Sequence, residues 1–243
     1  PRWPTMHRMS SAPPRPRSSA ALHLARKSWR LLYSDSQQCT ALAEKAHAAA
    51  LRRGDIAAQG WAGLTRGFHK IWYDTPSQAS VELEAAQRCF VSVGDAPGRL
   101  LAEVGLARCA WRQGDFDQAL QRVLPLRDEG LRVLKHDERG MLLNTIAGCY
   151  AELGESQQAF AYMYQALRET SAAKSLGYDV VLYCNLAHEL IQLGDYHQAL
   201  NYVEQGLERC ARLDNARLFS VLSKGQRLLI DAGKAKEALP LLD

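Results

Sequence analysis

A seven-residue pattern recurs at intervals of 40 residues and constrains the fold more than any other feature of this chain. Gly-Asp-Phe-Asp-Gln-Ala-Leu at 114–120 returns as Gly-Glu-Ser-Gln-Gln-Ala-Phe at 154–160 and as Gly-Asp-Tyr-His-Gln-Ala-Leu at 194–200. Weaker copies of the pattern occur at or within one residue of the equivalent positions of other repeats, at 35–39, 74–79 and 233–239. A fixed period of this length predicts a fold built from repeated units, each of which packs on its neighbours.

Each copy of the pattern predicts a corner between two helices. Glycine just past a helix can adopt the left-handed conformation that ends it, and the residue that follows can cap the next helix. A second corner falls midway between the copies, at Gly54-Asp55, Gly94-Asp95 and Leu213-Asp214-Asn215. Two helices of about 17 residues therefore form each repeat. Pro125 should kink or shorten the helix in which it lies, because proline removes an interior hydrogen bond.

The apolar residues inside a repeat follow helical spacing. They are Leu143, Ile146, Ala147 and Tyr150 in a first helix, Ala159, Met163 and Ala166 in a second, and Tyr183, Leu186, Ala187, Leu190, Ala199 and Val203 in the next repeat. This pattern resembles the tetratricopeptide motif, although the period of 40 exceeds the usual 34 of that family. The resemblance implies an all-α, right-handed superhelical solenoid of about six antiparallel helix pairs over residues 20–243.

Small residues mark the positions where the two helices of a pair should approach closely. Gly67, Ala107, Ala147 and Ala187 on first helices are expected to face Ala79, Ala119, Ala159 and Ala199 on second helices. A larger side chain at these positions would push the two helices apart.

The two ends of the chain differ from its middle. Residues 1–19 are rich in Pro, Arg and Ser and predict a disordered basic arm. An organelle transit peptide is the alternative, and whether the residues before Met9 are native stays open. Residues 239–243 fall inside an expected second helix, so we expect a repeat domain over 20–243 that is truncated at its C-terminus.

The charge distribution does not favour nucleic acid as a partner. The net charge is +4, but residues 1–34 carry seven Lys and Arg residues and no acid. The rest of the chain has 23 basic and 26 acidic residues, whereas a nucleic-acid binder concentrates positive charge on a folded face. No apolar run is long enough to cross a membrane, and we expect a cytoplasmic protein.

The sequence contains no motif that predicts catalysis, a metal or a cofactor. It lacks a phosphate-binding glycine loop, a nucleophile elbow, an HExxH pair and a CxxC pair, so we expect no catalytic residues and no enzyme. The dispersed cysteines predict reduced structural thiols. They are Cys39, Cys89, Cys109, Cys149, Cys184 and Cys210, of which Cys109 and Cys149 should fill equivalent packing sites one repeat apart.

The tetratricopeptide resemblance implies that the first helices line a concave groove that holds a peptide. Carrying the groove positions over by phase gives Trp61, Thr65, Phe68, Arg108, Trp111, Arg112, Asn144, Asn185 and His188 as candidate binding residues, with Leu64, Val104, Thr145, Gly148 and Gln192 at further groove positions. Aromatic, arginine and amide side chains commonly anchor peptides. Alternatively, Trp61 and Phe68 pack as core between adjacent helix pairs.

Two hypotheses for function follow. The first is a sensory or interaction module that binds a peptide or partner domain, as the N-terminal regulatory part of a bacterial signalling protein. An output domain such as a diguanylate cyclase or a transcription regulator would then lie beyond Asp243. The alternative is a stand-alone adaptor or assembly scaffold without an output domain. A homodimer is compatible with both hypotheses.

Overall fold

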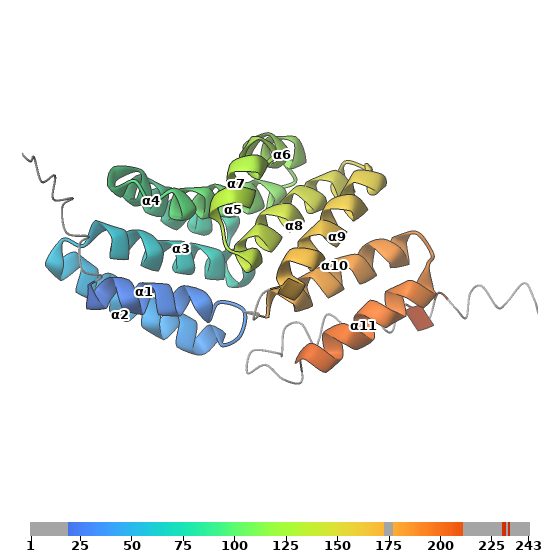
Figure 1. The fold of residues 1–243 in the computed structure, drawn as a ribbon, viewed down its shortest axis with the longest axis horizontal. Coiled ribbons are helices and arrows are strands. Elements are labelled where there is room, and N and C mark those ends of the chain that lie inside the picture. Colours follow the sequence, from blue (N-terminus) through green and yellow to red (C-terminus); the bar gives the residue numbers. More distant parts are fainter. Residues whose placement is uncertain (1–18, 173–176, 211–229, 232, 234–243) are drawn as a thin grey trace, which may run out of the picture.

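The computed structural model describes residues 19–172, 177–210, 230, 231 and 233. Within these residues the chain is helical and contains no strand (Figure 1). Its elements are α1 (Ala20–Arg30), α2 (Ser36–Arg53), α3 (Ile56–Tyr73), α4 (Pro76–Val93), α5 (Ala96–Arg112), α6 (Phe116–Val123), the 3-10 helix η1 (Leu124–Leu126), α7 (Arg127–Val133), α8 (His136–Glu152), α9 (Ser156–Ala172), α10 (Tyr178–Gln192) and α11 (Tyr196–Cys210).

The helices pair in chain order, and successive pairs stack into a solenoid (Figure 1). The pairs within the described residues are α1 with α2, α3 with α4, α5 with α6–α7, α8 with α9, and α10 with α11. Each first helix also packs on the first helix of the next pair. The prediction of an all-α solenoid is confirmed, and most of the expected sixth pair lies outside the described residues.

The predicted corners that lie within the described residues form as their sequences indicate, whereas the corner at 213–215 and most of the copy at 233–239 lie outside those residues. Gly114, Gly154 and Gly194 have φ values of 84°, 79° and 77°, which lie in the left-handed region that glycine adopts without strain. At the first of these corners, the backbone N–H of Gln118 donates to Oδ1 of Asp115 at 3.3 Å and so caps α6. Glycine and an acidic cap therefore turn the chain at the end of a first helix.

Pro125 interrupts the second helix of the third pair, as predicted. That helix is divided into α6, η1 and α7, and Pro125 lies within η1. Because proline has no backbone N–H, the regular α-helical hydrogen bonding stops there and the chain continues through a tighter turn.

The predicted small positions lie where the helices of a pair meet, and the alanines at these positions are buried. The position occupied by glycine has no room for a side chain. A Cβ atom added to Gly67 of α3 would lie 2.6 Å from Cγ of Leu83 in α4. The absence of a side chain at Gly67 therefore sets the spacing between α3 and α4.

The solenoid also curls back on itself through α1. We define the inner face as the surface formed by the first helices α1, α3, α5, α8 and α10. Nε1 of Trp29 in α1 donates to Oε1 of Glu138 in α8 at 3.1 Å, although 109 residues separate them in sequence. The rings of Tyr33 and Tyr178 meet edge to face with centroids 4.9 Å apart. Aromatic side chains therefore fill much of the inner face.

The expected N-terminal arm falls largely outside the described residues, which begin at Ser19. Ser19 caps α1, because its hydroxyl accepts from the backbone N–H of Leu22 at 2.9 Å. The expected domain boundaries, the truncation at the C-terminus and the right-handed sense of the superhelix stay predictions.

Substituting Ala147→Leu should lower the free energy of unfolding by about 1–3 kcal/mol, because Ala147 is fully buried and the added atoms overpack its site. Ala161→Leu is the matched control, since Ala161 is exposed on α9. Urea unfolding followed by circular dichroism measures both variants. Equal stability of the two variants would contradict the helix register.

Candidate functional site

A pocket of about 230 Å³ opens on the inner face between the first helices of the second to fifth pairs. We call it the Arg108 pocket. Its lining residues are Ile71, Trp72, Arg108, Trp111, Arg112, Asn144, Thr145, Gly148, Val181 and Asn185. Five of the nine candidate binding residues line it, namely Arg108, Trp111, Arg112, Asn144 and Asn185.

Arg108 is held in place by two tyrosines from opposite ends of the solenoid. Its Nη1 donates to Oη of Tyr33 at 3.1 Å, and its Nη2 donates to Oη of Tyr178 at 2.9 Å. The guanidinium also lies 5.8 Å from the ring centroid of Trp72. Burial raises the pKa of Tyr33 to about 12, so its hydroxyl is neutral near pH 7. The two hydroxyl groups orient the charge of Arg108 and do not neutralise it.

Arg112 adds a second positive charge to the pocket. Its guanidinium donates to the backbone carbonyl of Ile71, near the end of α3. No aspartate or glutamate lines the pocket, and neither Arg108 nor Arg112 forms an ion pair within the described residues. Guanidinium groups match the geometry of carboxylates. The pocket is therefore suited to an anionic group.

Amide and indole groups complete the polar wall. Nδ2 of Asn144 donates to Oη of Tyr178 at 2.9 Å, and Nδ2 of Asn185 donates to Oδ1 of Asn144 at 3.0 Å. Nε1 of Trp111 donates to the backbone carbonyl of Gly148 at 3.2 Å, while 36% of Trp111 stays exposed. A partly exposed indole beside fixed amides provides an apolar surface and oriented hydrogen-bonding groups for a ligand.

Three candidate residues are buried and lie outside the Arg108 pocket, so they form no open groove wall there, and Trp61 borders a separate cavity instead. Phe68 and Thr65 have no exposed surface, and Trp61 is 5% exposed. The ring of Trp29 in α1 packs edge to face against Phe68, with centroids 5.1 Å apart, and against Trp61, with centroids 6.2 Å apart. Because α1 covers them, these residues belong to the core, as the alternative interpretation of Trp61 and Phe68 expected.

His188 is exposed on α10 and does not line the Arg108 pocket. Conversely, the candidates did not include Ile71, Trp72 and Val181, which do line it. Ile71 and Trp72 lie one period before Trp111 and Arg112. Applying the positions of Trp111 and Arg112 to the preceding repeat would therefore have identified Ile71 and Trp72 as candidates.

The described residues offer little for metal binding or thiol chemistry. Among them, no group of three or more His, Cys, Asp and Glu side chains could hold a metal ion. Burial raises the pKa of the Cys39 and Cys149 thiols to about 12, which keeps both protonated near neutral pH. Cys109 and Cys149 are both buried, one repeat apart. In the described ranges no helix has the length and apolar character needed to span a membrane.

The helix pairs, their corners and the small contact residues define a tetratricopeptide-type repeat fold. The model of the tetratricopeptide repeat family matches residues 180–212. The fold is similar to the crystal structure of NprR in complex with its cognate peptide NprX, with a TM-score of 0.64 and 15% sequence identity. That match covers 90% of this chain and 64% of the NprR chain, so the present sequence spans just under two thirds of its neighbour. No curated protein matches this sequence.

Removing the hydroxyl of Tyr33 should destabilise the fold. Tyr33→Phe deletes an acceptor of a charged donor, Arg108, and hydrogen bonds of this kind contribute about 1.5–3 kcal/mol. Tyr73→Phe is the control, because Tyr73 is half exposed. Thermal and urea unfolding should rank Tyr33→Phe well below Tyr73→Phe. Equal stability of the two variants would show that the hydrogen bond between Arg108 and Tyr33 does not stabilise the fold.

The same residue predicts a loss of stability at alkaline pH. The pKa of Tyr33 in the folded state, about 12, lies above the usual value of 10.0, so the folded state holds this proton more tightly than the unfolded chain. The contribution is complete below pH 10 and is lost as the pH rises from 10 to 12. The unfolding free energy of the wild type should therefore fall more steeply over this range than that of Tyr33→Phe. Parallel curves would contradict this assignment.

Proposed function

We propose that this protein is a regulatory repeat module that binds an extended peptide, or a peptide-like segment of a partner, and accepts an acidic group in the Arg108 pocket. The observation that carries the proposal is the pair Arg108 and Arg112, which face a pocket without any acidic side chain. Arg108 is partly buried and Arg112 is exposed, and a partly buried cation that lacks a counter-ion favours a ligand that supplies one.

The polar groups around the arginines support a peptide as the ligand. Asn144 and Asn185 present amides next to the two guanidiniums, and Trp111 presents an indole at the mouth. Amides can pair with a peptide backbone, and a partly exposed indole can cover an apolar side chain. The structural neighbour NprR forms a complex with its cognate peptide NprX, which is in keeping with this proposal.

The finer part of the proposal concerns biological context. We favour a sensory module of a bacterial signalling protein over a stand-alone scaffold, because the Arg108 pocket is a small, specific site instead of a broad docking face. The NprR chain extends beyond the part that this sequence matches, which is compatible with an additional output domain. The full-length native coding sequence distinguishes these alternatives directly.

Binding should depend on the acidic group of the peptide. We suggest screening an array of heptapeptides against the whole chain, then resynthesising the best binder with each Asp or Glu replaced in turn by Asn or Gln. Fluorescence anisotropy should show that one such replacement weakens binding about tenfold, since a charge-assisted hydrogen bond contributes about 1.4 kcal/mol or more.

The same peptide should identify the arginine that it contacts. Arg112→Gln should weaken binding about tenfold and reduce the preference for Asp over Asn in the peptide. Arg132→Gln is the matched control, because Arg132 is exposed on α7 and lies outside the pocket. Equal affinities of the two variants, or equal binding of the acidic and amide peptides, would overturn the proposed function.

A further inference from the structure

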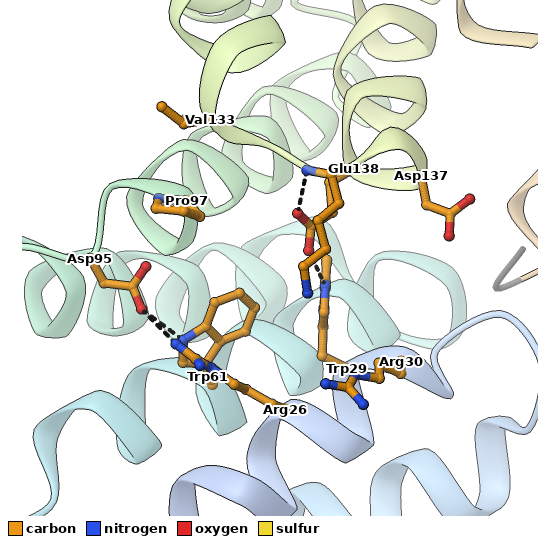
Figure 2. A pocket seen from close by; sticks show the side chains of 10 residues that line it. Arg26, Trp29, Arg30, Trp61, Asp95, Pro97, Val133, Asp137 and Glu138 are labelled. Carbon is orange, nitrogen blue, oxygen red and sulfur yellow. Dashed lines mark hydrogen bonds and ion pairs between the residues drawn. The ribbon is translucent and has the colours of Figure 1, made fainter. Parts of the chain in front are cut away.

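A second pocket of about 280 Å³ lies at another place on the inner face and shares no lining residue with the Arg108 pocket (Figure 2). It opens beside the N-terminal ends of α5 and α8, and α1 and α3 form its other walls. Its lining residues are Arg26, Trp29, Arg30, Trp61, Asp95, Pro97, Val133, Lys135, Asp137 and Glu138. We call it the Trp29–Trp61 pocket.

Two indoles form the apolar part of this pocket. Trp29 and Trp61 are 3% and 5% exposed and meet edge to face, with centroids 6.2 Å apart. Their N–H groups are already used, since Nε1 of Trp29 donates to Glu138 and Nε1 of Trp61 donates to Asp95. Pro97 and Val133 add apolar surface on the opposite side (Figure 2). What the indoles leave for a ligand is therefore the narrow apolar strip of each ring that stays exposed at the pocket.

Three carboxylates line the pocket: Asp137 is 8% exposed, and the other two, Asp95 and Glu138, accept hydrogen bonds from groups of the protein itself. Oδ1 of Asp95 accepts from the backbone N–H of Gly98 at 3.0 Å, and its Oδ2 accepts from Trp61 at 2.9 Å. Glu138 accepts from Trp29 and, through Oε2, from the backbone N–H of Lys135 at 3.1 Å. Both carboxylates lie at helix N-termini, where the helix dipole stabilises negative charge. Neither carboxylate requires a cationic ligand.

The cationic side chains that line the pocket are more exposed than these carboxylates and less fully paired. Arg30 and Lys135 are exposed, and neither forms an ion pair within the part of the chain that the structure describes. Arg26 lies 3.7 Å from Asp95 and stacks over the ring of Trp61 at 5.4 Å. Two cations without an ion-pair partner among the described residues therefore border an indole-lined cavity.

We propose that the Trp29–Trp61 pocket binds a small aromatic carboxylate as a second ligand, distinct from the peptide. The aromatic ring lies against the indoles between Pro97 and Val133, where edge-to-face contact is favourable. The carboxylate points outward and pairs with Arg30 and Lys135. The volume is near the lower end of that of ligand pockets, which matches a ligand of one or two fused rings.

The first test uses 1-naphthaleneacetate as the probe and isothermal titration calorimetry with the whole chain. A ligand of this size should bind with a dissociation constant of about 1 mM or lower. Two probes of similar shape check the role of charge: neutral 1-naphthaleneacetamide and cationic 2-(1-naphthyl)ethylamine should both bind at least about threefold more weakly. Absence of binding, or binding of either probe as tight as that of the acid, would overturn the proposal.

Variants then locate the site. Val133→Trp should abolish binding by filling the pocket, while Val93→Trp should not, because Val93 ends α4 outside the pocket. The two valines are one repeat apart and similarly exposed, at 41% and 42%. Melting temperatures of the two variants verify that both are folded. Unchanged binding by Val133→Trp would place the ligand elsewhere and overturn the proposal.

Charge variants test the carboxylate contact. The double variant Arg30→Gln, Lys135→Gln should weaken binding of the acid by about threefold to tenfold and leave binding of the amide unchanged. The double variant Lys45→Gln, Arg53→Gln removes two exposed cations of α2 and should have no effect. Equal affinities of the two double variants would contradict the assigned contact. Because the two pockets share no residue, failure here leaves the peptide proposal untouched.

Discussion

The contacts of Arg108 determine how the inner face of this solenoid is organised. Arg108 belongs to α5, yet it donates to Tyr33, which follows α1, and to Tyr178, the first residue of α10. Stacked helix pairs need contact only their neighbours, so a solenoid of this length could have left its inner face open. Here the arginine joins the first, third and fifth pairs, and the Trp29–Glu138 hydrogen bond adds a second link. Within the described residues the inner face is therefore largely filled, and the Arg108 pocket and the Trp29–Trp61 pocket share no lining residue instead of forming one continuous groove.

This arrangement prepares the Arg108 pocket for binding. A free arginine side chain loses considerable conformational entropy when it is fixed on a ligand, whereas Arg108 is already fixed by two hydroxyls and the Trp72 ring. Asn144 and Asn185 are ordered in the same way, by a chain of hydrogen bonds that starts at Tyr178. Binding therefore requires little further ordering of the pocket wall. The proposed specificity for an acidic group follows from charges that the protein orients but does not neutralise.

Local sequence was sufficient for the repeat architecture and insufficient for the inner face. The corners at Gly114, Gly154 and Gly194 and the break at Pro125 depend on backbone preferences of nearby residues, so the 40-residue period predicts them. The burial of Phe68 depends instead on Trp29 of α1, the first helix of the preceding pair, and the period does not predict an aromatic side chain at that position. The Trp29–Glu138 hydrogen bond and the contacts of Arg108 join pairs that are not adjacent, and such long-range closure leaves no periodic signal in the sequence. The 40-residue period identified Arg108 and Arg112 as candidates. It did not identify Tyr33 and Tyr178, which orient Arg108.

The central claim is that an acidic ligand group enters the Arg108 pocket and contacts its two guanidiniums. The most direct measurement is a titration of the protein, labelled with nitrogen-15 in arginine, with the best acidic heptapeptide, followed through the Nε–H resonances. Arg108→Lys, Arg112→Gln and Arg132→Gln assign the three signals by their loss. The resonances of Arg108 and Arg112 should shift in proportion to occupancy while that of Arg132 stays in place. Binding of the peptide without a change in the Arg108 and Arg112 resonances would contradict the claim.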